Sequence, residues 1–395
     1  MLQPKEFFEV GHATPPARKK SRLIALSVGL LITIGAVTWP VTRAHLQAVA
    51  ILRLVSGQKV PWIISRLVTQ PVRIEEVNFA TPAGVVRGRL YLPEQHTGAP
   101  GLVVLHGVHH LGIEEPRLAS FARAMASCGL RVLTPELPGI KDYHVDLGSV
   151  RVIEESARWF ARRTGAPIGV LGLSFSGGLA LVAAGNPEYR KDFKFVLAVG
   201  SQDEMSHVAT FYLTGKEAQP DGSIEHLTPH EYGPLVLEYE HLEDFVPARD
   251  EEAIRPVLRE HLYENSSAEK LAGAKLNARQ KGEAAELMDS NSPATKAKLA
   301  ASDGQHAQEM EELSPHKLLP TMTTPVYLLH GQADNIIPAA ETLWMASELP
   351  HTTLREALIS PVLSHVNLDE GKPRIDDQWR LVHFFALVMH AAERK

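Results

Sequence analysis

Short apolar runs, bounded by glycine, proline or charged residues, recur over two separate parts of the chain. An apolar run of about four to eight residues between turn-forming residues is typical of a strand that is buried on both faces. Amphipathic stretches between these runs predict connecting helices, for example over residues 148–163 and 339–348. The predicted strands cover residues 73–80, 85–92, 101–107, 131–134, 168–171, 195–199, 325–331 and 352–358.

The strand pattern is interrupted after residue 199 and returns only at Val326. Residues 201–320 are polar and rich in acidic side chains, and they show little strand character. A structureless loop of this length inside a compact domain is implausible, so the insert must have structure of its own. Helical patterns within it cover residues 250–264, 268–288 and 294–312.

The N-terminal part of the chain carries a nearly charge-free run, Leu23–Val41, directly after four basic residues between positions 18 and 22. About nineteen residues are just enough to cross a bilayer as a helix. The basic cluster predicts that residues 1–22 stay cytoplasmic and that the rest is exported, to the periplasm or the cell exterior. A secretory signal cleaved near residues 42–44 is the alternative interpretation.

Residues 42–72 are predicted to form a helical stalk between the apolar run and the first strand. Its apolar positions recur at helical spacing, at Leu46, Val49, Leu52 and Val55. Such a helix either rests on the membrane surface or packs on the domain that follows.

Composition narrows the possible partners. The net charge of −6 argues against a nucleic-acid partner, which would need a basic face. The single cysteine, Cys128, excludes an intramolecular disulfide, and we expect it to be a small buried residue in a helix. No phosphate-binding loop, H-E-x-x-H motif, cysteine cluster or calcium loop occurs, so the sequence predicts neither a cofactor nor a metal. The oligomeric state stays open.

A serine between a strand and a helix is the strongest chemical signal. The segment Val170–Gly178 has the sequence V-L-G-L-S-F-S-G-G, which places Ser174 at a sharp turn between small residues. This segment resembles the nucleophile elbow of α/β-hydrolases, G-x-S-x-G, with Ser176 where that family has glycine. Ser176 is therefore a rival nucleophile. Ser174 is preferred because it follows the strand at the family's spacing.

The run Gly101–Gly107, G-L-V-V-L-H-G, resembles the strand that opens the oxyanion loop in this family. The resemblance implies that the backbone N–H groups of Val108 and Phe175 form the oxyanion hole. We interpret His106 as a packing residue that orders the loop. His109 and His110 follow in the same loop, where they either face a pocket or are solvated.

The segment Pro325–Pro338, P-V-Y-L-L-H-G-Q-A-D-N-I-I-P, resembles the part of the family that carries the acid of the catalytic triad, here Asp334. His365 lies after the last predicted strand, where the family has its general base. The chain order Ser174, Asp334, His365 is the order of α/β-hydrolases. Asp203 follows the strand that carries the triad acid in some members of the family. The residues around Asp203 are much weaker evidence for this role than the residues around Asp334.

The resemblance covers residues 73–200 and 320–392 and implies an α/β-hydrolase fold, with a mostly parallel eight-stranded sheet flanked by helices. In this family an insert at the position of residues 201–320 forms a helical cap over the active site, and the alternative is a solvated elaboration. Phe211, Tyr212 and Leu213 are the apolar candidates for contact with substrate. The predicted organisation is a tail at 1–22, a transmembrane anchor at 23–41, a stalk at 42–72, a hydrolase core at 73–200 and 321–395, and the cap at 201–320.

These features predict a membrane-anchored serine hydrolase that cleaves an ester bond, or an amide or thioester, through an acyl-enzyme on Ser174. Its partner is then a small-molecule acyl substrate, and a peptidase or thioesterase activity stays open. The competing class is a non-catalytic α/β-hydrolase-like binding or scaffold protein at the membrane. Retention of Ser174, Asp334 and His365 favours the enzyme, because a binding protein needs none of them.

Overall fold

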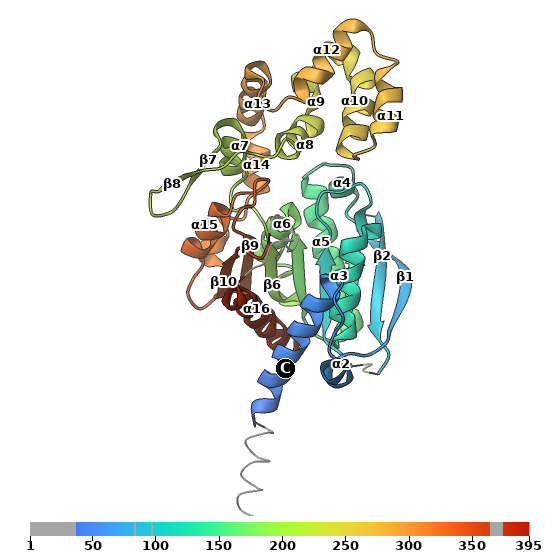
Figure 1. Ribbon diagram of the computed structural model, residues 1–395, viewed down its shortest axis with the longest axis vertical. Coiled ribbons are helices and arrows are strands. Elements are labelled where there is room, and N and C mark those ends of the chain that lie inside the picture. Colours follow the sequence, from blue (N-terminus) through green and yellow to red (C-terminus); the bar gives the residue numbers. More distant parts are fainter. Residues whose placement is uncertain (1–36, 83, 96–97, 364–373, 395) are drawn as a thin grey trace, which may run out of the picture. The chain divides into compact units, whose positions relative to one another are not determined.

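The computed structural model describes residues 37–82, 84–95, 98–363 and 374–394 of the 395-residue chain (Figure 1). The chain divides into two units, residues 1–43 and 44–395, and the second contains the hydrolase-like domain. The predicted tail and most of the predicted anchor, residues 23–41, lie outside the described residues. Within the described part of the chain, no helix has the length and apolar character needed to span a membrane.

The centre of the second unit is an eight-stranded sheet with the strand order β1-β2-β4-β3-β5-β6-β9-β10. Strand β2 pairs antiparallel with β1 and β4, and the remaining neighbours pair in parallel. This order and these directions are those of the α/β-hydrolase fold, so the predicted fold class is confirmed. The strands are β1 (Val72–Thr81), β2 (Gly84–Pro93), β3 (Gly101–Leu105), β4 (Arg131–Pro135), β5 (Ile168–Leu173), β6 (Phe193–Val199), β9 (Val326–Gly331) and β10 (Leu354–Ser360).

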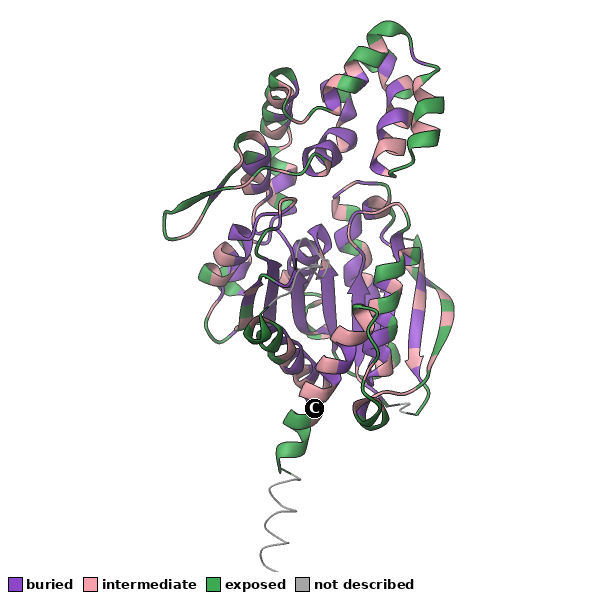
Figure 2. Ribbon diagram, in the orientation of Figure 1, coloured by how far each residue is buried: buried purple, intermediate pink, exposed green. Residues whose placement is uncertain are grey.

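Helices cover both faces of the sheet, and the central strands are almost entirely buried (Figure 2). Strand β3 shows the two-residue period, because Val103 and Leu105 belong to one apolar core and Leu102 and Val104 to the other. This burial explains why the central strands have continuous apolar sequences and not alternating ones. The main flanking helices are α3 (Pro116–Ser127), α5 (Leu147–Thr164), α6 (Phe175–Gly185), α15 (Ala340–Glu348) and α16 (Ile375–Glu393).

The helical residues 44–55 pack against the domain that contains the eight-stranded sheet. Ala44, Ala48 and Ile51 are buried in the second core, and the Gln47 side-chain amide donates to the carbonyl of Cys128 at 2.7 Å. The apolar positions chosen from the sequence, at 46, 49, 52 and 55, are only half buried. The buried face is instead the one rich in alanine, because small side chains allow the helix to approach the core closely. Cys128 is buried, as predicted.

The insert between β6 and β9 is mainly helical and lies beyond the carboxyl ends of the strands (Figure 1). The predicted helix over 268–288 is in fact two helices, because Asn277 starts a new one with a capping box to Gln280. The small hairpin β7–β8 was not predicted, although its P-D-G turn is visible in the sequence at residues 220–222. The elements are α7 (Met205–Thr214), β7 (Lys216–Ala218), β8 (Ile224–His226), α8 (Tyr232–Glu240), α9 (Leu242–Phe245), α10 (Ala248–Leu262), α11 (Ser266–Gly273), α12 (Ala278–Leu287), α13 (Pro293–Gln305) and α14 (Ala307–Glu312).

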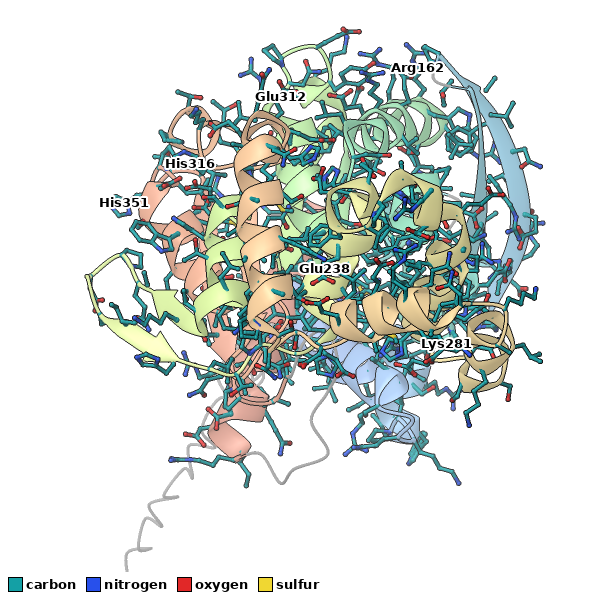
Figure 3. All side chains as sticks on the ribbon, turned by 90° about the horizontal axis from the view of Figure 1, so that it is seen from above. Arg162, Glu238, Lys281, Glu312, His316 and His351 are labelled. Atoms are coloured by element: carbon teal, nitrogen blue, oxygen red, sulfur yellow. The ribbon has the colours of Figure 1, made fainter. Side chains whose placement is uncertain are left out.

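A buried acid lies in the middle of the insert. Glu238 of α8 is fully buried among the insert's helices (Figure 3), and neither of its carboxyl oxygens has a hydrogen-bond partner among the described residues. Burial raises the pKa of Glu238 to about 8. The folded chain therefore retains a proton at this position that the unfolded chain releases near the ordinary pKa of 4.5.

We predict that Glu238→Gln stabilises the protein at high pH. The folded state binds more protons than the unfolded state between pH 4.5 and about 8, so the contribution of Glu238 to stability falls as the pH rises through this window. The variant should gain about 1–3 kcal/mol at pH 8 and nothing at pH 4.5, as measured by urea unfolding at both values. A gain that does not depend on pH would contradict the assignment, and Glu312→Gln on the surface is the control.

Candidate active site

Ser174 occupies a strained turn between β5 and α6. Its backbone has φ 56° and ψ −138°, a combination that non-glycine residues rarely adopt and that costs about 1–3 kcal/mol. Its N–H donates to the carbonyl of Val199 at 2.8 Å, and its carbonyl accepts from the N–H of Gly177 at 2.9 Å. The strain is therefore maintained by backbone bonds on both sides of the turn.

The small residues around Ser174 are required by close backbone contacts. A Cβ atom at Gly172 would lie 2.4 Å from the carbonyl oxygen of Ser176, and one at Gly177 would lie 1.9 Å from the Ser201 Oγ. Both distances are far below van der Waals contact. The glycines thus let α6 begin directly against the end of β5 and the loop after β6.

The two serines of the motif have different surroundings. Ser176 is fully buried, and its hydroxyl donates to the carbonyl of His106 at 2.6 Å. The hydroxyl of Ser176 is therefore used to attach the turn to the end of β3. Ser174 retains a 5% exposed surface at the carboxyl edge of the sheet.

His106 orders the loop after β3. Its Nε2 accepts from the N–H of Leu137 at 3.0 Å, and its Nδ1 lies 2.9 Å from the carbonyl of Gly107. Burial lowers the pKa of His106 to about 4, so the imidazole is neutral near pH 7 with its proton on Nδ1. These contacts agree with the interpretation of His106 as a packing residue.

The predicted oxyanion donors lie on the two segments that meet at Ser174. A Cβ atom at Gly107 would lie 3.4 Å from the Ser174 Cβ, so the loop that begins with Val108 adjoins the turn. Phe175 is the first residue of α6, where backbone N–H groups have no partner within the helix. The carbonyl of Val108 accepts from the hydroxyl of Tyr232 of α8 at 2.8 Å.

Asp334 lies three residues beyond β9, at the same sheet edge as Ser174. It is buried, and its Oδ1 accepts from the N–H groups of Ile336 at 3.0 Å and Ile337 at 3.1 Å. Backbone donors stabilise the charged form of a carboxylate. The predicted base, His365, lies outside the described residues, which reach Leu363 before the gap.

Asp203, the weaker candidate for the acid, has an opposite environment. It is fully buried, and neither carboxyl oxygen has a hydrogen-bond partner among the described residues. Burial first, and then the nearby Glu341, raises the pKa of Asp203 to about 9. A triad acid must be ionised to stabilise the imidazolium, so this environment favours Asp334 for that role.

Aromatic residues of the insert contact the loop after β3. Tyr263 stacks on His110 with ring centroids 4.3 Å apart, and His110 stacks on His109 at 4.6 Å. The hydroxyl of Tyr143, in the core, donates to the carbonyl of Leu262 at 2.9 Å. The contacts of Tyr263 with His110 and of Tyr143 with Leu262 could not be predicted from the sequence, because each joins residues more than a hundred positions apart.

The three apolar candidates from the sequence lie in α7. Phe211 and Tyr212 are buried in the larger apolar core, and Leu213 is half buried against it. A pocket of about 250 Å³ is lined by Gln332, Ala333 and Leu363 near Asp334 and by residues of the β7–β8 hairpin.

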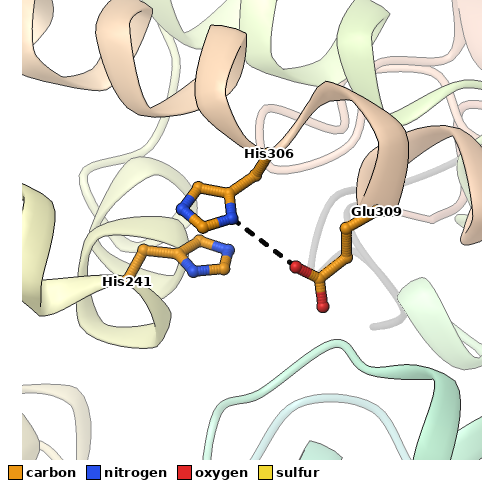
Figure 4. A group of neighbouring side chains, drawn as sticks. All are labelled: His241, His306 and Glu309. Carbon is orange, nitrogen blue, oxygen red and sulfur yellow. Dashed lines mark ion pairs between the residues drawn. The ribbon is translucent and has the colours of Figure 1, made fainter.

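One group of metal-ligating side chains occurs within the insert, formed by His241, His306 and Glu309 (Figure 4). The two imidazole rings are stacked, with centroids 3.6 Å apart and planes 14° from parallel. Ring nitrogens bind a metal in the ring plane, so this arrangement does not direct both rings to one ion. His306 is instead paired with Asp244 through Nε2 at 3.0 Å and lies near Glu309, at 3.6 Å through Nδ1.

No protein-family profile matches the chain, and no curated protein matches its sequence. An acylaminoacyl peptidase in complex with Z-Gly-Gly-Phe-chloromethyl ketone is similar at 16% identity and a TM-score of 0.49, over 84% of this chain and 43% of that one. A Pyrobaculum calidifontis esterase has 16% identity and a TM-score of 0.44, with coverages of 88% and 91%. The esterase domain of a Rhodothermus marinus protein has 15% identity and a TM-score of 0.45, over 80% of this chain and 98% of that one. The chain spans less than half of the length of the peptidase, and at these identities the likeness concerns the fold and not the activity.

The packing around the turn can be tested with Gly177→Ala. The added methyl group collides with Ser201, so we expect a loss of about 1–3 kcal/mol in the free energy of unfolding. Ser201→Gly in the same chain should restore part of this loss, because it removes the nearest atoms. Gly282→Ala is the matched control, since nothing lies within 4 Å of its added methyl and alanine favours the helix. Equal effects at positions 177 and 282 would contradict the described turn.

Proposed function

We propose that this chain is a serine hydrolase that cleaves esters through an acyl-enzyme on Ser174. The observation that carries the proposal is the strained turn that holds Ser174 at the carboxyl edge of the sheet. Asp334, whose Oδ1 accepts from two backbone N–H groups, lies at the same edge. Strained backbone at a serine is costly, and such strain is concentrated at functional sites.

In the proposed reaction, His365 accepts the proton of the Ser174 hydroxyl as the Oγ atom attacks the carbonyl carbon of the substrate. Asp334 orients the imidazole and stabilises its cation. The N–H groups of Val108 and Phe175 stabilise the negative charge on the carbonyl oxygen. The protonated His365 then gives its proton to the departing alkoxide, and a water molecule hydrolyses the acyl-enzyme by the same steps.

The insert is proposed to act as a cap, and the contact between Tyr232 and Val108 supports this role. Their hydrogen bond joins α8 to the peptide that follows the proposed oxyanion donor. Tyr263, stacked on His110, adds an aromatic surface to the same loop. An aromatic and apolar surrounding favours a small acyl substrate. Cleavage of amide and thioester bonds is tested by comparing such substrates with the ester in the same enzyme.

We also propose, from the apolar run Leu23–Val41 and the basic residues before it, that the chain is anchored to a membrane with the hydrolase domain exported. Cleavage of this segment as a secretory signal is the alternative. The proposed chemistry at Ser174 does not depend on which of the two holds.

A fluorophosphonate probe, which reacts covalently with activated serines, tests the proposal before any substrate is known. We expect labelling of the full chain and of Ser176→Ala, and none of Ser174→Ala. Ser176→Ala loses the hydrogen bond to His106 and about 1 kcal/mol of stability, so it is the matched control for damage to the turn.

Two results would overturn parts of this proposal. If folded wild-type protein does not react, the chain belongs to the non-catalytic binding class. If Ser176→Ala alone abolishes labelling, the nucleophile is Ser176, although the hydrolase class stands. Peptide mapping of the labelled site separates these outcomes.

A further inference from the structure

A second group of ionisable side chains lies where the insert joins the core. Asp203 lies in the loop after β6, at the start of the insert. His316, labelled in Figure 3, lies after α14, at the end of the insert. Glu348 is the last residue of α15, in the core. One carboxylate oxygen or imidazole nitrogen from each of these three residues lies within 4.8 Å of the other two.

Three of the four carboxyl oxygen atoms of this group lack hydrogen-bond partners among the described residues. Asp203 is fully buried, and both of its carboxyl oxygens are without a hydrogen bond among the described residues. The Oε2 atom of Glu348 is also buried and has no such partner, while its Oε1 lies 3.4 Å from the His316 Nδ1. Buried polar atoms in native proteins are nearly always bonded to something, so these three oxygens require an explanation.

The neighbouring charges are already compensated. The Oε2 atom of Glu341 accepts from the N–H groups of Asp203 and Glu204, at 2.8 and 2.9 Å. His207 lies 3.4 Å from both the Glu341 and the Glu204 carboxylates, and the Glu341 carboxylate raises the pKa of His207 to about 9. Glu341 therefore fixes the loop that carries Asp203, and the His207 cation compensates the acids on that side. Among the described residues, Asp203 has no ion-pair partner, and Glu348 has only the imidazole of His316.

We propose that Asp203, His316 and Glu348 bind a divalent transition-metal ion of the zinc type. Two carboxylates and one imidazole neutralise its charge, and zinc accepts this mixed set of oxygen and nitrogen ligands. Calcium and magnesium prefer oxygen ligands throughout, so the imidazole disfavours them. Three protein ligands leave further coordination positions for water.

The bound ion would act as a clamp at the base of the insert. Asp203 and His316 belong to the two chain segments that connect the insert to the core, and Glu348 belongs to the core itself. An ion held by all three would fix both connections to α15. This role is separate from the chemistry proposed for Ser174 and does not require it.

The test uses the full chain after treatment with a chelator, followed by titration with Zn²⁺ in a calorimeter and by thermal unfolding with and without Zn²⁺. We expect one saturable site per chain and a higher melting temperature in Zn²⁺ but not in Ca²⁺. Asp203→Asn and Glu348→Gln should each weaken Zn²⁺ binding by at least about tenfold. Glu309→Gln, from the stacked histidine group, is the matched control and should bind Zn²⁺ like the wild type.

Both ligand variants preserve side-chain volume and replace a carboxyl group in which at least one buried oxygen atom lacks a hydrogen-bond partner among the described residues, so their metal-free melting temperatures should equal or exceed that of the wild type. If Asp203→Asn fails to fold, Zn²⁺ binding by Glu348→Gln decides the test. The Glu348 side chain is partly exposed, so its substitution disturbs the fold less. Absence of Zn²⁺ binding by the wild type, or unchanged binding by Glu348→Gln, would overturn the proposal. Loss of binding in Glu309→Gln alone would assign the ion to the other group.

Discussion

The tight turn at Ser174 is the constraint on which the rest of the site depends. The turn places a serine in a backbone conformation that is unfavourable for any residue other than glycine. Hydrogen bonds to Val199 and from Gly177 hold it, and the Ser176 hydroxyl attaches it to the end of β3. The ends of three strands, β3, β5 and β6, therefore fix the position of the Ser174 turn. A turn with a purely structural role would not need this many contacts.

Two buried aspartates at the same sheet edge show how local donors decide the chemistry of a carboxyl group. Asp334 receives two backbone N–H groups, which favour its anion. Asp203 receives none among the described residues, and burial raises its pKa to about 9. The first environment suits an acid that must stay charged beside a histidine. The second suits a group that keeps its proton near neutral pH or releases it to bind a metal ion.

The sequence predicted the central strands and the turn well, because their physical causes are local. Strands such as β3 and β5 are buried on both faces, which gives continuous apolar runs, and the turn requires glycine at 172 and 177. Contacts between distant segments could not be predicted. The bond from Tyr232 to Val108 and the group of Asp203, His316 and Glu348 are created by the topology alone.

The helix over residues 44–55 shows a second limit. The larger apolar side chains at helical spacing predicted that their face of the helix is the buried one. In the structure, the buried face is a different one, which contains alanines. Hydropathy favours large residues, whereas close packing of a helix on a core favours small ones. The predicted base His365 and the apolar run before residue 37 stay predictions from the sequence.

The central claim is that Ser174 is activated by a histidine that Asp334 orients. The most direct measurement is the rate of fluorophosphonate labelling as a function of pH, in the wild type, in Asp334→Asn and in the surface control Asp221→Asn. We predict that the wild-type rate rises as an imidazole loses its proton, and that Asp334→Asn lowers the plateau by about three to four orders of magnitude while the control does not. Labelling of Asp334→Asn at the wild-type rate would contradict the account.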